Sequence, residues 1–250
     1  MISEYIIKPA VTALRTLTII PVPGSDTPVF GRSLLCFPLA GVIIGGLCCG
    51  LLFLLTSYTN ADPLLVSALI VFLSVLITGA LHLDGIADVA DGFGGGKTKE
   101  KILEIMKDPR QGTFGVSAIV FDIIIKTLLI RPLVENDAYT SIGALFLVSR
   151  GLQPLLIAFF PYARKDGGTA APFSEGAKSF AVFSVLVTMA VVTYVLKASG
   201  LVMFSVALLI VLIWGLYCKK KIGGITGDCI GAGNEFAEMT ILLCSNLVII

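Results

Sequence analysis

Residues 83–98 read LDGIADVADGFGGGKT and decide between two folds. The end of this stretch, Gly96-Lys97-Thr98, matches the end of a nucleotide-binding P-loop, a motif of soluble α/β proteins, whereas its beginning reads as an acidic helix. A P-loop requires a further glycine five residues before Gly96. Asp91 stands there, so a carboxylate would occupy the place of the backbone amides that cradle phosphate. We therefore expect the acidic half to carry the chemistry.

The composition places the chain in a membrane. Of its 250 residues, 56% are hydrophobic and 14% are charged, and the mean hydropathy is +0.96. Soluble domains carry about 25% charged residues. The six cysteines form no Cys-x-x-Cys pair and lie mostly in apolar runs. We expect them to be small buried side chains rather than disulfides or zinc ligands.

Several apolar segments are long enough to cross a bilayer, which takes about 17–25 residues. The seven segments are 34–58, 63–83, 112–130, 138–160, 179–196, 200–218 and 229–250. Before them, segment 2–20 is interrupted by Lys8, Pro9 and Arg15, and no Ala-x-Ala-type cleavage site follows. It is typical of an amphipathic helix on the membrane surface, not of a signal peptide. The expected fold class is an all-α polytopic membrane protein, with about seven transmembrane helices and this N-terminal interfacial helix, in one domain (1–250).

The basic residues indicate how the chain is oriented. Most Lys and Arg residues fall in alternate connections, namely 1–33, 84–111, 161–178 and 219–228. The connections on the other side carry only Arg131 and Lys197. The positive-inside rule therefore predicts a cytoplasmic N-terminus and a cytoplasmic acidic loop and helix at 84–111. Because the candidate motifs fall on this side, we expect a site in the cell (inner, cytoplasmic) membrane that opens to the cytoplasm.

Asp84, Asp88 and Asp91 are spaced i, i+4 and i+7, which places them on one face of a helix. Three like charges at the edge of a low-dielectric slab repel one another unless a cation lies between them. Mg²⁺ is commonly bound by carboxylates together with substrate phosphates. The alternative is a solvated helix face. The residues between and next to the carboxylates include Gly85, Ala87, Ala90 and Gly92, which permit a close approach of backbone and substrate that a solvated face does not need.

A second group of charges follows in ILEIMKDPRQGTFG. Glu104 and Asp108 are again spaced i, i+4, and Lys107 and Arg110 stand beside them. Alone, this segment reads as a mixed-charge surface helix. Together with the three aspartates it offers a second carboxylate pair and two cations for phosphate.

Charged residues within the apolar segments need a partner or a polar cavity. Asp122 and Lys126, spaced i, i+4, either neutralise one another or face an anionic substrate, and Arg150 has no such neighbour on its own segment. Glu235 and Glu238 either join a metal site or pair with Lys126 or Arg150. The sequence does not choose between these possibilities.

Two further residues stand near the acidic motifs. His82 precedes Asp84 by two residues, and either makes an interfacial hydrogen bond or orients a carboxylate or contacts phosphate. Asp228 lies among glycines at the start of the last segment. Both are candidates for the site.

The motifs together resemble those of the adenosylcobinamide-GDP ribazoletransferases, or cobalamin synthases. They are TIIPVP (18–23), FPLAG (37–41), LHLDGIADVADGFGG (81–95), LEIMKDPRQGTFG (103–115), SRG (149–151), YARKDGG (162–168) and GGITGDCIGAGNE (223–235). The resemblance covers nearly the whole chain. It implies a Mg²⁺-dependent transferase of late cobalamin (vitamin B12) biosynthesis. α-Ribazole or its 5′-phosphate joins adenosylcobinamide-GDP, giving adenosylcobalamin or its 5′-phosphate and GMP. The two substrates and the lipid bilayer are the expected partners, and no nucleic acid.

The residues can be given roles in such a reaction. Asp84, Asp88 and Asp91 are the expected catalytic residues, with Asp91 preferred as acceptor of the proton from the attacking ribose hydroxyl. The expected ligands of Mg²⁺ are Asp84, Asp88, Asp91, Glu104 and Asp108. The expected substrate-binding residues are His82, Lys107, Arg110, Lys126, Arg150, Arg164, Asp228 and Glu235.

Two other functions compete with this one. The acidic spacing is reminiscent of the CDP-alcohol phosphatidyltransferases, although the arginine that follows their first two acids has no counterpart here. A cation transporter also places charges in its spans. It would have charged features reaching both sides and repeated halves, whereas the motifs here gather at one face.

Overall fold

The computed structural model describes residues 6–164 and 167–249. Lys165 and Asp166 of the YARKDGG motif lie outside this part of the chain. Within it, the secondary structure is helical, and an isolated bridge between Tyr162 and Ile225 is the only strand-like pairing. The predicted all-α fold class is confirmed. The elements, with η for a 3-10 helix, are α1 (Lys8–Leu17), η2 (Phe30–Cys36), α2 (Phe37–Tyr58), α3 (Pro63–Thr78), α4 (Leu81–Gly95), α5 (Lys99–Ile105), α6 (Thr113–Glu135), α7 (Tyr139–Phe159), η3 (Ala171–Ser174), α8 (Ala177–Ile222) and α9 (Gly227–Ile249).

Several helices are suited to a membrane. In the described part of the chain, four are long and apolar enough to cross one: Phe30–Tyr58, which joins η2 to α2, and α6, α7 and α8. The bent pair α3 and α4 makes a fifth if it forms one span. Apolar side chains such as Phe53, Phe121 and Leu209 point outward from α2, α6 and α8, as on a surface that lipid tails cover. The predicted number of seven spans and the cytoplasmic N-terminus stay predictions.

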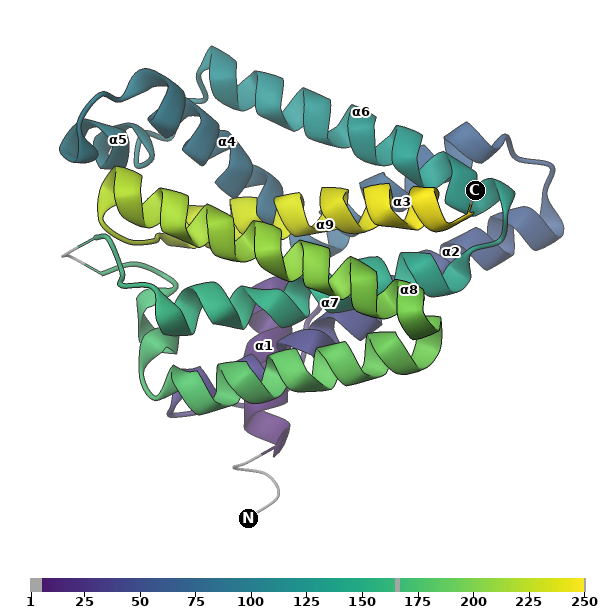
Figure 1. Ribbon diagram of the computed structural model, residues 1–250, viewed down its shortest axis with the longest axis horizontal. Helices are drawn as coiled ribbons and strands as arrows, with labels where there is room; N and C mark the ends of the chain where they lie inside the picture. Colours follow the sequence, from purple (N-terminus) through teal and green to yellow (C-terminus); the bar gives the residue numbers. More distant parts are fainter. Residues whose placement is uncertain (1–5, 165–166, 250) are drawn as a thin grey trace.

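The N-terminal segment forms the short helix α1, which crosses the long helices (Figure 1). Pro9, Ala13 and Leu17 are buried on one of its faces, and α1 packs against η2 and α2. The predicted amphipathic helix is therefore present, although residues 2–5 lie outside the described chain. Its place at a membrane surface stays a prediction.

The predicted span 63–83 is divided by a sharp bend. α3 ends at Gly79, and both Gly79 and Ala80 adopt left-handed backbone conformations with φ of 59°. Glycine ends helices in this way because it lacks the Cβ that opposes positive φ. α4 then runs at 90° to α3. The acidic residues thus lie on a separate helix and not at the end of α3.

The glycine-rich part of the opening stretch connects two helices. Gly96 caps the C-terminus of α4, and Thr98 is the N-cap of α5, where its hydroxyl accepts a hydrogen bond from the amide of Lys101 at 3.3 Å. Helix α4, not a strand, precedes these residues. The segment therefore lacks the context that a P-loop requires.

Helix α8 has two arms. Its 46 residues are interrupted at Lys197, whose φ of 56° and ψ of −136° are not helical, and the chain folds back there (Figure 1). A Cβ on Gly200 would collide with the carbonyl oxygen of Val192, so glycine permits the close return. The break confirms the predicted separation of segments 179–196 and 200–218.

Helix α7 lies at the centre of the molecule. Helices α2, α8 and α9 pack around it (Figure 1). Of its apolar stretch 78% is buried, compared with 22% for α6. Polar side chains on α7 therefore face protein, and those partners come from the surrounding helices.

The contact that builds the site is between α4 and α9. A Cβ on Gly85 would lie 2.8 Å from the carbonyl oxygen of Asp228, and one on Gly231 would lie 3.3 Å from Cα of His82. Larger residues would separate the two helices. Small residues beside the aspartates therefore permit the close backbone approach that the sequence predicts at this place.

Candidate active site

An acidic cluster lies where α4, the start of α9 and the loop after α7 meet, at the left end of Figure 1. Asp84 and Asp88 come from α4 and Asp228 comes from the first turn of α9. The negative charges of Asp84 and Asp228 act on Asp88. In the described part of the chain, the carboxylate of Asp84 has no hydrogen-bond or ion-pair partner. Two predicted catalytic residues and one predicted substrate-binding residue are thus brought together.

Arg164 is the cation of this cluster. Its Nη2 donates to Oδ2 of Asp228 at 2.7 Å. The loop that carries it is held on the start of α9, because the amide of Ala163 donates to the carbonyl of Ile225, and the amide of Ile225 donates to the carbonyl of Pro161. The arginine is therefore fixed beside the carboxylate of Asp228, and its charge also acts on Asp88. Its role in phosphate binding stays a prediction.

Asp91 has a different set of partners. Its two carboxylate oxygens accept hydrogen bonds from the backbone amides of Gly112, at 2.6 Å, and Gly115, at 2.9 Å. These residues begin α6, so Asp91 caps that helix, where a negative charge is favourable. Nearby, Gln111 donates to Oδ1 of Asp88 at 3.3 Å. The LEIMKDPRQGTFG motif therefore reaches the aspartates through its end and not through its acids.

The acids of that motif form ion pairs at the surface. Glu104 pairs with Lys101 at 2.9 Å, and Asp108 pairs with Arg110 at 2.7 Å. The hydrogen bonds from Arg110 lower the pKa of Asp108 to about 2, so this acid is ionised at neutral pH. The structure does not bring Glu104 and Asp108 to the aspartates of α4, as their predicted role in binding metal would require. Arg110 is likewise exposed and turned to Asp108.

The predicted metal site can be compared with these positions. Among residues 6–164 and 167–249, no group of three or more His, Cys, Asp or Glu side chains is placed so that it could hold a metal ion. Mg²⁺ is often bound by only one or two carboxylates, with waters and substrate phosphates completing its shell. Asp84 and Asp88 offer such a pair of oxygen ligands. The chemistry of the site therefore fits Mg²⁺ with fewer protein ligands than the five predicted.

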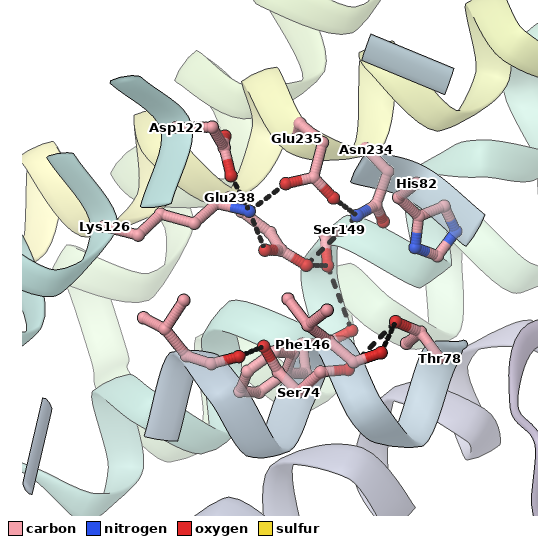
Figure 2. A network of polar contacts seen from close by, with 12 residues as sticks. Ser74, Thr78, His82, Asp122, Lys126, Phe146, Ser149, Asn234, Glu235 and Glu238 are labelled. Carbon is pink, nitrogen blue, oxygen red and sulfur yellow. Dashed lines mark hydrogen bonds and ion pairs between the residues drawn. The ribbon is translucent and has the colours of Figure 1, made fainter. Parts of the chain in front are cut away.

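The charged residues of the apolar segments form a buried network (Figure 2). Nζ of Lys126 contacts Glu235, Glu238 at 2.7 Å and Asp122 at 3.2 Å. Arg150, which is 2% exposed, donates to Glu238 through Nη1. Among the alternatives that the sequence leaves open, ion pairing is the correct one.

This network corrects the prediction that Lys126, Arg150 and Glu235 bind substrate. All three are buried, and the cavity between them and Asp122 has a volume of about 20 Å³. A water molecule needs about 10–15 Å³ of such space, so a phosphate group does not fit. Charges in an apolar interior must be paired. Here both cations are paired with carboxylates of α9. The network holds α6, α7 and α9 together.

His82 joins this network to a larger cavity. Its Nε2 lies 3.0 Å from Nε2 of Gln153, which also donates to Oδ1 of Asn234 at 2.8 Å. His82 and Gln153 line a cavity of about 450 Å³ together with Asp84 and Asp228. The location of His82 therefore supports its selection as a site residue.

A second cavity lies on the other side of Arg164. Its volume is about 500 Å³, and Lys99, Lys107 and Arg164 line it together with Glu100 and Glu104. The ion pair of Arg164 with Asp228 separates this cationic cavity from the first one. Lys107 is thus placed beside a cavity, as its predicted role requires.

Sequence reasoning missed Gln111, Gln153 and Asn234. Gln153 follows Arg150 by three residues inside an apolar segment, and Asn234 precedes Glu238 by four, so both stand on the polar face that the charged residues mark. The signal that could have identified Gln153 and Asn234 is an uncharged amide side chain within an apolar segment. Gln111 had none beyond its place in a motif.

The helical fold and these cavities define a membrane-type protein with an acidic, two-cavity site at one end of its helix bundle. The chain belongs to the cobalamin-5-phosphate synthase family, whose pattern it matches over residues 9–246. A protein of Chlorobaculum tepidum is 39% identical over 241 residues, covering 95% of this chain and 94% of its own length. One of Chlorobium chlorochromatii is 37% identical over 245 residues, 96% of either chain, and one of Clostridium novyi is 36% identical over 219 residues, 86% and 85%. All three are named adenosylcobinamide-GDP ribazoletransferase. No solved structure matches the chain.

Proposed function

We propose that this chain is an adenosylcobinamide-GDP ribazoletransferase, which joins α-ribazole or its 5′-phosphate to adenosylcobinamide-GDP and releases GMP. The product is adenosylcobalamin or its 5′-phosphate, in a late step of cobalamin biosynthesis. The family and the names of its relatives support this activity. The observation that carries it to particular residues is the cluster of Asp84, Asp88, Asp228 and Arg164 between two cavities. A reaction of two substrates needs such an arrangement.

The reaction forms one bond and breaks another at a single phosphorus. A ribose hydroxyl of ribazole attacks the phosphorus that carries the cobinamide arm, and the bond from this phosphorus to the oxygen of GMP breaks. The hydroxyl proton passes to a carboxylate, and the leaving GMP takes the electron pair of the broken bond. The chain must therefore provide a proton acceptor and a counter-charge for the diphosphate.

Both oxygens of Asp91 already accept hydrogen bonds from backbone amides at the start of α6, so this carboxylate is directed at that helix and not at a substrate. Asp88 has one long hydrogen bond, from Gln111 at 3.3 Å, and the negative charges of Asp84 and Asp228 act on it. Such neighbours favour uptake of a proton, and a carboxylate that binds a cation through one oxygen keeps the other for the proton.

The counter-charge comes from Arg164 and from a bound cation. Arg164 can donate two parallel hydrogen bonds to a phosphate when it leaves Asp228. We propose that Asp84 and Asp88 hold Mg²⁺, which when bound neutralises negative charge on the diphosphate. Asp91 remains a possible third ligand, since each of its oxygens keeps a further lone pair. We place the site at the cytoplasmic face of the cell membrane, because the Lys- and Arg-rich connections lie on its side.

Metal removal tests this proposal. Protein purified in detergent is incubated with adenosylcobinamide-GDP and α-ribazole, and the corrinoid product and GMP are measured by chromatography. We expect equal amounts of both with Mg²⁺ and less than about 1% of that rate in EDTA, since one metal ion contributes several kcal/mol of charge stabilisation. Added Mg²⁺ restores the rate. Product formation at the full rate in EDTA would contradict the metal proposal, and turnover of CDP-diacylglycerol instead would contradict the function.

A further inference from the structure

We propose that the cavity of about 450 Å³ beside Asp84 is the binding site for the aromatic base of the ribazole substrate. This inference rests on the proposed function and adds to it which of the two substrates enters which cavity. Four observations carry it: the size of the cavity, its aromatic wall, the polar group fixed at its inner end, and the charges that line the two cavities.

The size of the cavity restricts its occupant. Small-molecule sites have volumes of roughly 300–1,000 Å³, so about 450 Å³ is enough for a bicyclic base with a ribose. The corrin macrocycle with its amide side chains is several times larger and does not fit. Of the reacting groups, only the ribazole or the guanosine arm can enter.

The wall of the cavity is aromatic. Phe30, Phe37 and Phe173 all line it, and Phe173 packs edge-to-face on the other two, with ring centroids 5.3 and 6.1 Å apart. They come from η2, α2 and η3, so only the fold brings them together. Apolar and aromatic walls with few polar groups are typical of sites for planar organic ligands. A benzimidazole-type base suits this wall better than guanine, whose edge carries several hydrogen-bonding groups.

One polar group is fixed at the inner end. Gln153 is 3% exposed, and its amide nitrogen is held by Asn234 at 2.8 Å and by His82 at 3.0 Å. Its side-chain oxygen accepts no hydrogen bond from the described residues. Gln153 lines the cavity, and there this acceptor has no donor from the described residues. A ligand that donates a hydrogen bond, such as a ribose hydroxyl, would satisfy it.

The position of the charges decides between the two substrates. Asp84 and Asp228 line the aromatic cavity, and its described lining includes no Lys or Arg, so the cavity offers no protein cation to the two phosphates of a guanosine arm. The second cavity has three cations, Lys99, Lys107 and Arg164, and two carboxylates in its lining. The uncharged nucleoside therefore belongs in the aromatic cavity, with its hydroxyls toward Asp84, and the diphosphate belongs beside Arg164.

Two variants of the cavity test this assignment. Ala170→Leu adds three carbons to its lining, and Phe173→Leu removes an aromatic ring but keeps an apolar side chain. The matched control is Phe183→Leu on α8, whose ring is 57% exposed and lines neither cavity. For each purified protein, KM is measured separately for α-ribazole and for adenosylcobinamide-GDP. Binding of α-ribazole alone is measured by equilibrium dialysis.

We expect the KM for α-ribazole to rise at least about tenfold in both cavity variants, the effect of a changed contact in an apolar pocket. Its dissociation constant should rise in parallel, while the KM for adenosylcobinamide-GDP stays within about twofold and the control is unchanged. A rise in the KM for adenosylcobinamide-GDP with that for α-ribazole unchanged would assign the cavity to guanosine and overturn the inference, as would no change in either. Failure of the wild type to form product would instead refute the proposed function. Even then, saturable binding of α-ribazole in dialysis, weakened by Ala170→Leu, would support the assignment of the cavity.

Discussion

Asp88→Asn is expected to lower the transfer rate by at least about 100-fold, the smaller end of what a proton acceptor contributes. Asparagine keeps the shape of the side chain but cannot take up the hydroxyl proton, and it offers a metal ion one neutral oxygen instead of a carboxylate. Asp88 is half-buried, and its one hydrogen bond is long. The folded protein should therefore survive the change.

The measurement is the initial rate of corrinoid formation with both substrates saturating. Asp137→Asn is the matched control, because Asp137 is exposed just beyond the end of α6 and has a φ of 49°, which asparagine adopts readily. Its rate should stay within about twofold of the wild type. If Asp88→Asn keeps more than about a tenth of the rate while Asp91→Asn loses it, the proton acceptor is Asp91, as the sequence alone indicated.

Glu238→Gln is expected to lower the free energy of unfolding by about 3–5 kcal/mol, the cost of breaking a buried ion pair on one side. Glu238 contacts Lys126, as Figure 2 shows, and it also pairs with Arg150. Its loss leaves Arg150 buried without a carboxylate partner, while Lys126 keeps Asp122 and Glu235. The effect should therefore exceed that of Glu235→Gln, after which each cation still has a carboxylate.

Unfolding of the detergent-solubilised protein in SDS measures this difference. Glu135→Gln is the control: Glu135 pairs with Arg131 at 2.8 Å on the exposed surface, and such pairs contribute about 0–1 kcal/mol. The double variant Arg150→Met, Glu238→Leu should recover part of the loss, because no unpaired charge remains. Equal effects of Glu238→Gln and Glu135→Gln would show that the network does not stabilise the fold.

Much of the fold follows from the sequence because apolar length and helix breakers are local signals. The segments expected at 112–130 and 138–160 are α6 and α7 with small changes at their ends, and the separation near Lys197 is present. The bend at Gly79 and Ala80 could not be predicted, since an apolar run continues through it and alanine rarely adopts the positive φ that Ala80 has. That bend sets the direction of α4 and so of the acidic residues.

The candidate site was predictable in its chemistry but not in its partners. Helical spacing placed Asp84 and Asp88 on one face, and the structure adds Asp228 and Arg164, both already candidates. Spacing could not show that Asp91 meets the start of α6, because that contact depends on how a later helix packs.

The buried cations show the same limit. A charge within an apolar segment indicates a polar partner, but the sequence does not say whether that partner is a substrate or another side chain. For Lys126 and Arg150 the acids of α9 supply the answer. The aromatic cavity was likewise invisible, since its three phenylalanines come from separate segments.

The central claim is that the chain transfers a cobinamide phosphate to ribazole with release of GMP. The most direct test uses adenosylcobinamide-GDP that carries ³²P only in the phosphate next to guanosine. After reaction with α-ribazole, the account predicts that all label is found in GMP and none in the corrinoid product, because the attacked phosphorus is the one attached to cobinamide. Label in the corrinoid product, or release of GDP, would contradict it.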